Sequence, residues 1–202
     1  MKYKAIIFDN AGVVIDESHR RWAQKIAERF RQPFDLIYQN YSRGEAWQLY
    51  KRGLINEDTF WERGNKAANL NLDINCMRQI VRESRIPIAG MDTIIKKLHI
   101  NYLLALMNNE GKEWDEYSKK RHSFYQLFTL MISSHAHGVV KPEPEIYQIL
   151  ADKLQEFGIK PSECIYIDDK AANLVPADKL GIRTVLFSEI KSFRKELMRL
   201  GL

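Results

Sequence analysis

Charged and amide side chains follow several strand-like runs of this sequence, at positions where they could form one site. They are Asp9, Asn108, Asn109, Lys141, Asp168 and Asp169. Taken alone, an Asp after a strand often forms a turn or caps a helix. Two acidic positions, amides and an ammonium gathered from distant segments would instead form a charged site for a small ligand. Whether they gather depends on the elements that carry them.

The elements that must position these residues alternate between strands and helices. Five apolar runs predict strands at residues 4–8, 102–109, 128–134, 163–169 and 183–187. Helical patterns predict helices at 90–98, 111–127, 142–158, 171–181 and 189–200. This alternation predicts an α/β fold with a doubly wound, parallel, five-stranded sheet. Ligands bind beyond the carboxyl ends of the strands in such sheets, so the polar positions above would share one rim.

Residues 18–87 differ from the rest because the whole stretch is helical in pattern. Apolar residues recur at four-residue spacing, and Asn56 followed by Thr59 predicts a helix start. We therefore expect a small all-helical cap at 18–87, inserted after the first strand of a core formed by 1–17 and 88–202.

The totals narrow the functional class. The chain has 202 residues and a formal charge of +5, and it carries two cysteines, too few for a disulfide framework. The sequence contains no run of about 18 apolar residues, so no membrane span is expected. The N-terminus lacks the pattern of a secretory signal. We expect a cytoplasmic protein with no membrane partner. The basic residues are spread out, so nucleic-acid binding is not expected.

Four motifs resemble the haloacid dehalogenase superfamily of aspartyl-nucleophile phosphatases and related hydrolases. They read IIFDNAGVVID, LLALMNNE, GVVKPEPEIYQIL and IYIDDKAANLVPADKLGIRTVLF. The likeness covers nearly the whole chain, and the insertion point matches the small helical cap of that superfamily. The resemblance implies a Rossmann-like core and hydrolysis of a small phosphorylated metabolite.

The resemblance also implies roles for individual residues. Asp9 would be the nucleophile and would form a covalent aspartyl-phosphate. Mg²⁺ would be held by Asp9, by the backbone carbonyl of Ala11 and by Asp169, since this ion prefers oxygen ligands. Lys141 would bind the nucleophile and the phosphate, offsetting their repulsion.

The remaining site residues would support these. Asp168 stands where many relatives have Gly and would support the site, and Asn173 would orient the ligands of the metal. Asn108 and Asn109 would contact the substrate, with Asn108 donating through its amide to the transferring phosphoryl group. A register shifted by one residue would place Met107 there instead, and Met107 cannot donate.

The motifs depart from the superfamily at Ala11. Its phosphatases usually carry a second Asp there, which protonates the leaving alcohol. A general acid or base contributes about 10²–10⁴-fold, so ordinary ester hydrolysis should suffer. Water, Asn10, a substrate group, or a carboxylate such as Asp16 or Glu110 could replace it, and acyl phosphates need little protonation.

Three other functions stay open. The dehalogenase branch lacks the second Asp because a halide leaves without a proton. The phosphonate-cleaving branch has Ala at this position and uses a cap Lys to form a Schiff base, for which Lys51 is a candidate. The third is a catalytically degenerate protein that keeps the fold for binding or regulation. The sequence does not fix the oligomeric state.

Overall fold

A single parallel sheet organises the α/β part of the protein. The computed structural model describes residues 2–16 and 19–202. The strands are β1(Ala5–Phe8), β2(Leu103–Asn108), β3(Leu130–Ser133), β4(Cys164–Asp168) and β5(Arg183–Leu186), in the spatial order β3-β2-β1-β4-β5. All four strand pairs are parallel. The prediction of a doubly wound, five-stranded parallel sheet is confirmed.

The strand order places β1 at the centre. The chain runs from β1 to β2 and β3 on one side and then crosses to β4 and β5 on the other. Phe8 pairs with Leu106 of β2 and with Ile167 of β4. The direction of winding therefore reverses between β1 and β4, and the crevice at such a switch point is where α/β sheets bind ligands.

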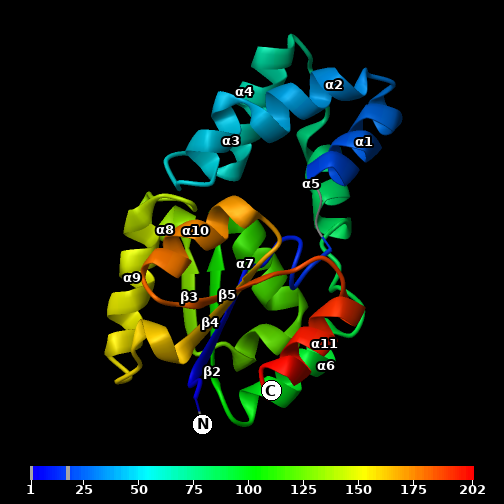
Figure 1. Cartoon of the computed structure of the whole chain (residues 1–202). Helices are drawn as coiled ribbons and strands as arrows, with labels where there is room; N and C mark the ends of the chain where they lie inside the picture. The colour runs from blue at the N-terminus through cyan, green and yellow to red at the C-terminus, as the bar shows by residue number, and fades with distance from the viewer. Residues whose placement is uncertain (1, 17–18) are drawn as a thin grey trace.

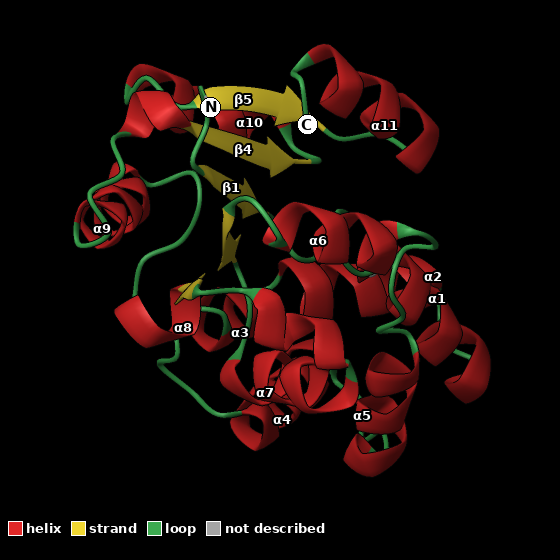
Figure 2. Cartoon of the chain, turned by 90° about the horizontal axis from the view of Figure 1, so that it is seen from below, coloured by secondary structure: helices red, strands yellow, loops and turns green. Residues whose placement is uncertain are grey.

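Helices cover both faces of the sheet (Figure 2). Side chains alternate along a strand, so Ile6 and Phe8 face one side, with α6(Met91–His99), α11(Ile190–Arg199) and the 3₁₀ turn η2(Ser123–Leu127). Ala5 and Ile7 face the other, with α9(Pro144–Gln155) and α10(Ala171–Lys179). The remaining elements of this part are α7(Lys112–Arg121), α8(Ser134–His137) and η3(Pro161–Glu163).

The helical insert is the second body of the molecule, and we use this name for residues 19–83. It contains α1(His19–Phe30), α2(Phe34–Ile37), the π-helix η1(Tyr38–Arg43), α3(Glu45–Tyr50), α4(Glu57–Ala68) and α5(Ile74–Glu83). Figure 1 shows it on the side of the sheet toward which the strand arrows point. It has its own apolar core, which Trp114 of α7 enters from below. The carboxyl ends of the strands therefore face the insert.

Most predicted elements match the structure within a few residues. The Asn56 side chain accepts the backbone N–H of Thr59 at 2.9 Å and caps α4 as expected. The helix predicted at 111–127 is divided, because His122 has an extended backbone (φ −126°) between α7 and η2. The predicted boundary between residues 17 and 18 lies outside the described residues.

Among those that are described, no helix has the length and apolarity needed to cross a membrane.

Candidate active site

Asp9 lies directly beyond the end of β1 and is only 4% exposed. Its backbone N–H donates to the carbonyl of Ile167 at 2.8 Å, which fixes it against β4. Its Oδ1 accepts the Asn10 backbone N–H at 2.6 Å and lies 2.7 Å from Lys141 Nζ. Burial raises the pKa of Asp9 to about 7, against the attraction of Lys141 and with the repulsion of Asp168. A cation bound beside this carboxyl would favour its ionised, nucleophilic form.

Lys141 joins the two acidic strand ends. Its Nζ lies 2.7 Å from Asp9, 2.8 Å from Asp168 and 3.0 Å from the Tyr166 hydroxyl. The Asn109 side-chain amide makes two hydrogen bonds to the backbone of Lys141: it accepts the Lys141 N–H at 2.7 Å and donates to the Lys141 carbonyl at 2.8 Å. Burial lowers the pKa of Lys141, but the two carboxylates outweigh burial and raise it. The ammonium therefore stays charged, and the observed contact of Asn109 is to the Lys141 backbone.

Asp168 is buried beneath the rim and accepts several hydrogen bonds. It accepts the Lys170 backbone N–H at 2.8 Å and the Asn173 amide at 3.0 Å on each oxygen. The Tyr166 hydroxyl also donates to it. Burial opposes the charge of Asp168, but Lys141 and these hydrogen bonds outweigh it and lower the pKa. Both oxygens are engaged, which fits the supporting role expected of Asp168.

A carboxylate cluster at the rim fits a small, hard cation. Asp9, Asp168 and Asp169 each offer an oxygen, and these atoms all lie within 4.8 Å of one another. Oxygens on opposite sides of Mg²⁺ lie about 4.2 Å apart. Within the described residues, Asp169 Oδ1 is buried without a hydrogen-bond partner, and Lys170 Nζ is 4.0 Å away. A Cβ on Gly12 would lie 2.6 Å from Asp169 Oδ2, so glycine leaves the room that this carboxylate occupies.

The structure resolves which residue ends β2 toward the site. Met107 is fully buried in the apolar core, and its neighbour Asn108 lines the rim. Asn108 Nδ2 donates to Asp115 at 3.2 Å, while its Oδ1 is buried with no partner in the part of the chain that is described. Asp115 also accepts from the Ser133 hydroxyl at 2.9 Å. The hydrogen bond to Asp115 thus orients the Asn108 amide, and the second N–H of its NH₂ group is left to donate to a ligand.

Ala11 borders the cavity and carries no acid, and Asn10 does not supply one. The Asn10 amide donates to Glu110 at 2.9 Å and accepts from the Tyr125 hydroxyl at 2.6 Å. Glu110 is itself held by Arg85 at 2.7 Å, with both side chains buried. The suggested replacement by Asn10 finds no support, because its side chain is committed to this buried network.

Asp16 remains as a carboxylate on the cavity wall. It lies 2.8 Å from Arg21 in an exposed ion pair, with 44% of its side chain accessible. An exposed ion pair of this kind is weak. Asp16 is therefore easier to redirect than Glu110.

A cavity of about 630 Å³ lies between the rim and the helical insert. The α/β part contributes Asp9, Ala11, Gly12, Asp16, Asn108, Asn109, Glu110, Lys141, Pro142, Asp169, Lys170, Ala172 and Asn173. The insert contributes His19, Arg20, Tyr38, Ser42, Arg43, Trp47, Gln48 and Lys51. The structure thus brings all the site residues predicted from sequence together, except Asp168, which lies directly below.

Sequence reasoning missed several residues of the site. Tyr166 contacts Lys141 and stands two residues before Asp168, so strand alternation could have placed it on the same face. Asp115 and Arg85 were not expected at the site, because the i,i+4 spacing of Asp115 and Lys119 is typical of an ordinary helix ion pair and Arg85 meets Glu110 25 residues further along the chain. Of the insert residues on the cavity wall, Lys51 was predicted as a candidate, whereas Arg20, Ser42 and Arg43 were missed.

Comparison with known proteins identifies the family of the chain. Residues 6–187 match the haloacid dehalogenase-like hydrolase family. Over 98% of its length, the chain is 27% identical to bifunctional epoxide hydrolase 2 of Mus musculus, of which it spans 38%. It is 24% identical to D-ribitol-5-phosphate phosphatase of Bacteroides thetaiotaomicron, with 96% of each chain covered.

Solved structures support the same assignment of fold. A haloacid dehalogenase family enzyme of Bacteroides thetaiotaomicron in complex with magnesium has a TM-score of 0.77 at 20% identity, with 98% of this chain and 100% of that chain covered. The complex of that enzyme with magnesium and inorganic phosphate has a TM-score of 0.75 at 21% identity, covering 93% and 96% of the two chains. The match over residues 6–187 and the shared fold together show that this chain belongs to the haloacid dehalogenase-like hydrolases.

Proposed function

We propose that the protein hydrolyses a small phosphorylated metabolite through an aspartyl-phosphate formed on Asp9, with the helical insert acting as a cap. One observation carries the proposal: Asp9, Asp169 and the ammonium of Lys141 meet at the switch point of the sheet, where Asp169 Oδ1 is buried and accepts no hydrogen bond from any described residue. Such a set binds a cation and, through it, a phosphate.

The residues divide the chemistry among them. Mg²⁺, held by Asp9, Asp169 and the backbone carbonyl of Ala11, would neutralise the phosphate. Asp9 attacks phosphorus and displaces the leaving oxygen, and water then cleaves the aspartyl-phosphate to give inorganic phosphate and free Asp9. Lys141 offsets the repulsion between the carboxylate and the substrate. Asn108 donates its remaining N–H to the phosphoryl group. Asp168 holds Lys141 in place throughout.

Ala11 sets the expected substrate preference. With no acid at this position, the leaving group departs unprotonated or takes its proton from water, from the substrate or from Asp16. Acyl and aryl phosphates release stable anions and are the expected good substrates. Alkyl phosphates should react slowly, by up to about 10²–10⁴-fold relative to a protonated path.

The relatives support the reaction class. D-ribitol-5-phosphate phosphatase matches over 96% of each chain, and the enzyme structure with inorganic phosphate shares the fold. The chain spans 38% of the mouse epoxide hydrolase, 12% of its rat counterpart and 19% of mouse acyl-CoA dehydrogenase family member 10.

The test is a phosphatase assay on acetyl phosphate and para-nitrophenyl phosphate, with Mg²⁺ or with EDTA. Wild type should turn over both with Mg²⁺ only, and Asp9→Asn should be inactive. Asp178→Asn makes the same chemical change at an exposed position and should behave as wild type. Equal rates in wild type and Asp9→Asn would refute the nucleophile. Phosphate binding without turnover would favour a binding protein.

A second candidate is cleavage of an aldehyde-bearing phosphonate. The observation that favours it is Lys51, which borders the cavity and whose pKa burial and Arg52 lower to about 8. A lysine of lowered pKa suits Schiff-base formation. Borohydride with such a substrate should then reduce an adduct onto Lys51, and Lys51→Arg should abolish it. No adduct in wild type would eliminate this candidate.

A further inference from the structure

The wall that the insert presents to the cavity is basic. Arg20, Arg43 and Lys51 line it, and Lys170 joins them from the α/β part. None of the first three has a carboxylate within 4.0 Å among the residues that the structure describes. Two acidic residues that border the cavity from the α/β part are paired with other cations, since Asp16 pairs with Arg21 and Glu110 with Arg85.

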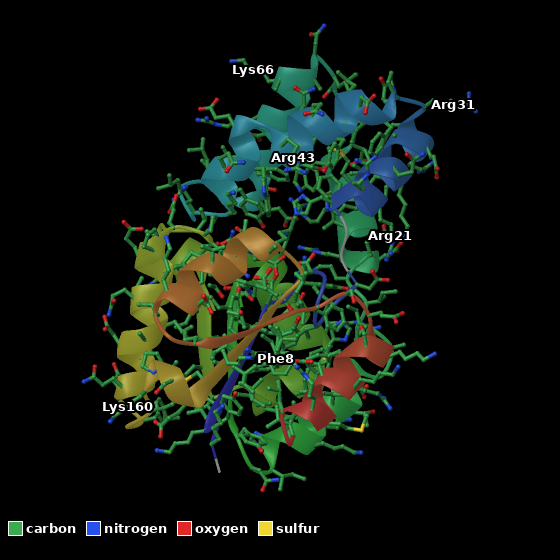
Figure 3. All side chains as sticks on the ribbon, in the orientation of Figure 1. Phe8, Arg21, Arg31, Arg43, Lys66 and Lys160 are labelled. Carbon is green, nitrogen blue, oxygen red and sulfur yellow. The ribbon has the colours of Figure 1, made fainter. Side chains whose placement is uncertain are left out.

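Tyr38 arranges the two guanidinium groups. The Arg20 guanidinium carbon lies 5.3 Å from the centre of the Tyr38 ring, and that of Arg43 lies 5.4 Å from it. Arg43 Nε also donates to the Tyr38 hydroxyl at 3.0 Å, which leaves its terminal nitrogens for another acceptor. Tyr38 and Arg43 belong to the π-helix η1, a rare form that is frequent at functional sites. The cations are therefore positioned rather than merely exposed. Figure 3 labels Arg43 in the insert, above the α/β part.

Ser42, between these residues in the sequence, is a buried donor without a partner. It is 3% exposed, it borders the cavity, and its Oγ makes no hydrogen bond to any described residue. Buried hydroxyls are nearly always paired. An acceptor brought by a ligand would satisfy Ser42 and face the arginines at once.

The positive field reaches well into the cavity. Burial, together with the charges of Lys170, Arg85, Arg43 and Lys51, lowers the pKa of His19 to about 3. His19 is therefore neutral and adds no charge of its own. Cations held this close together repel one another, and an anion among them would relieve the repulsion.

We infer that the substrate carries a second anionic group, a carboxylate or a phosphate, which the insert binds through Arg20, Arg43 and Ser42 while its reacting phosphate lies at Asp9. This inference depends on the proposed phosphatase function. It narrows the substrate class to phosphate esters with a negative charge at the far end.

The test compares esters of matched skeleton with and without that charge. The pairs are 3-phosphoglycerate with glycerol 3-phosphate and 6-phosphogluconate with sorbitol 6-phosphate, and glucose 1,6-bisphosphate against glucose 6-phosphate tests a phosphate as the second group. Wild type should favour the charged member of at least one pair by about tenfold or more in kcat/KM, the scale of one charge-assisted hydrogen bond. Which pair responds identifies the second group.

Arg43→Gln should lose that preference, with the uncharged member changed less than about threefold. Arg31→Gln is the matched control, since Figure 3 shows Arg31 at the outer edge of the insert. Circular dichroism should show both variants folded. Equal kcat/KM within every pair, or a preference that survives in Arg43→Gln, would overturn the inference.

A binding measurement separates this inference from the proposed function. Calorimetric titration of the same esters into Asp9→Asn needs no turnover. Tighter binding of the charged member, lost in Asp9→Asn with Arg43→Gln, supports the subsite even if wild type is inactive. Turnover of the esters with no difference in binding or rate within any pair refutes the subsite and leaves the phosphatase proposal standing.

Discussion

Replacing Lys141 by Gln removes the charge that holds two buried carboxylates together. Its Nζ lies 2.7 Å from Asp9 and 2.8 Å from Asp168, and both carboxylates are at least 95% buried. Removing one partner of a buried ion pair costs about 3–5 kcal/mol, because the other charge is left uncompensated. We expect Lys141→Gln to lower the free energy of unfolding at pH 8 by this amount.

The loss should shrink as the pH falls. The pKa of Asp9 is already raised from 3.8 to about 7 by burial, and losing the attraction of Lys141 raises it further. A carboxyl whose folded pKa exceeds its unfolded pKa contributes stability that is present below the unfolded value and is lost as pH rises through the folded value. Relative to wild type, the deficit of the variant should shrink by up to about 1.4 kcal/mol per pH unit, for one proton, from pH 8 to about pH 7. Below that pH the wild-type Asp9 is protonated as well, so the remaining deficit should stay constant down to pH 5.

Urea denaturation in EDTA at the two pH values measures this directly. Lys153→Gln is the control, because Lys153 pairs with Glu156 at 2.8 Å but both side chains are about half exposed. Its loss should stay below about 1 kcal/mol at both pH values. Equal losses for the two variants, or a deficit in Lys141→Gln that grows toward pH 5, would refute the account of the buried cluster.

Three further predictions concern activity. Ala11→Asp should raise kcat/KM on alkyl phosphates by about 10²–10⁴-fold and on aryl phosphates far less, and an unchanged ratio of the two rates would contradict the assigned acid position. Asp169→Asn should weaken Mg²⁺ activation by tenfold or more, measured as the Mg²⁺ concentration at half-maximal rate, whereas Asp178→Asn should not. KM for a substrate with two anionic groups should rise above pH 8 as Lys51 loses its proton, since burial, Arg52, Lys170 and Arg43 lower its pKa to about 8 against the opposing effect of Glu143. The same profile in Lys51→Arg would refute the assignment to Lys51.

The sheet and the rim could be predicted because both follow from local pattern. Buried parallel strands read as short apolar runs, and whatever follows their carboxyl ends must meet at one edge. Asp9 and Asp169 were found in this way. The choice between Met107 and Asn108 could not be made, because a shift of one residue exchanges the two faces of a strand.

The insert wall could not be predicted from the sequence. Its helical pattern showed which residues are apolar, but the directions of Arg20 and Arg43 depend on how the insert sits on the sheet. The ion pair of Arg85 with Glu110, which engages a proposed acid, joins segments 25 residues apart that no local pattern links.

Trapping the covalent intermediate tests the central claim most directly. Wild type mixed with acetyl phosphate and Mg²⁺ and quenched in acid within the first turnover should carry one phosphoryl group. Peptide mass spectrometry should place it on Asp9, and Asp9→Asn should carry none. A phosphoryl group on another residue, or full turnover with no adduct at any quench time, would contradict the claim.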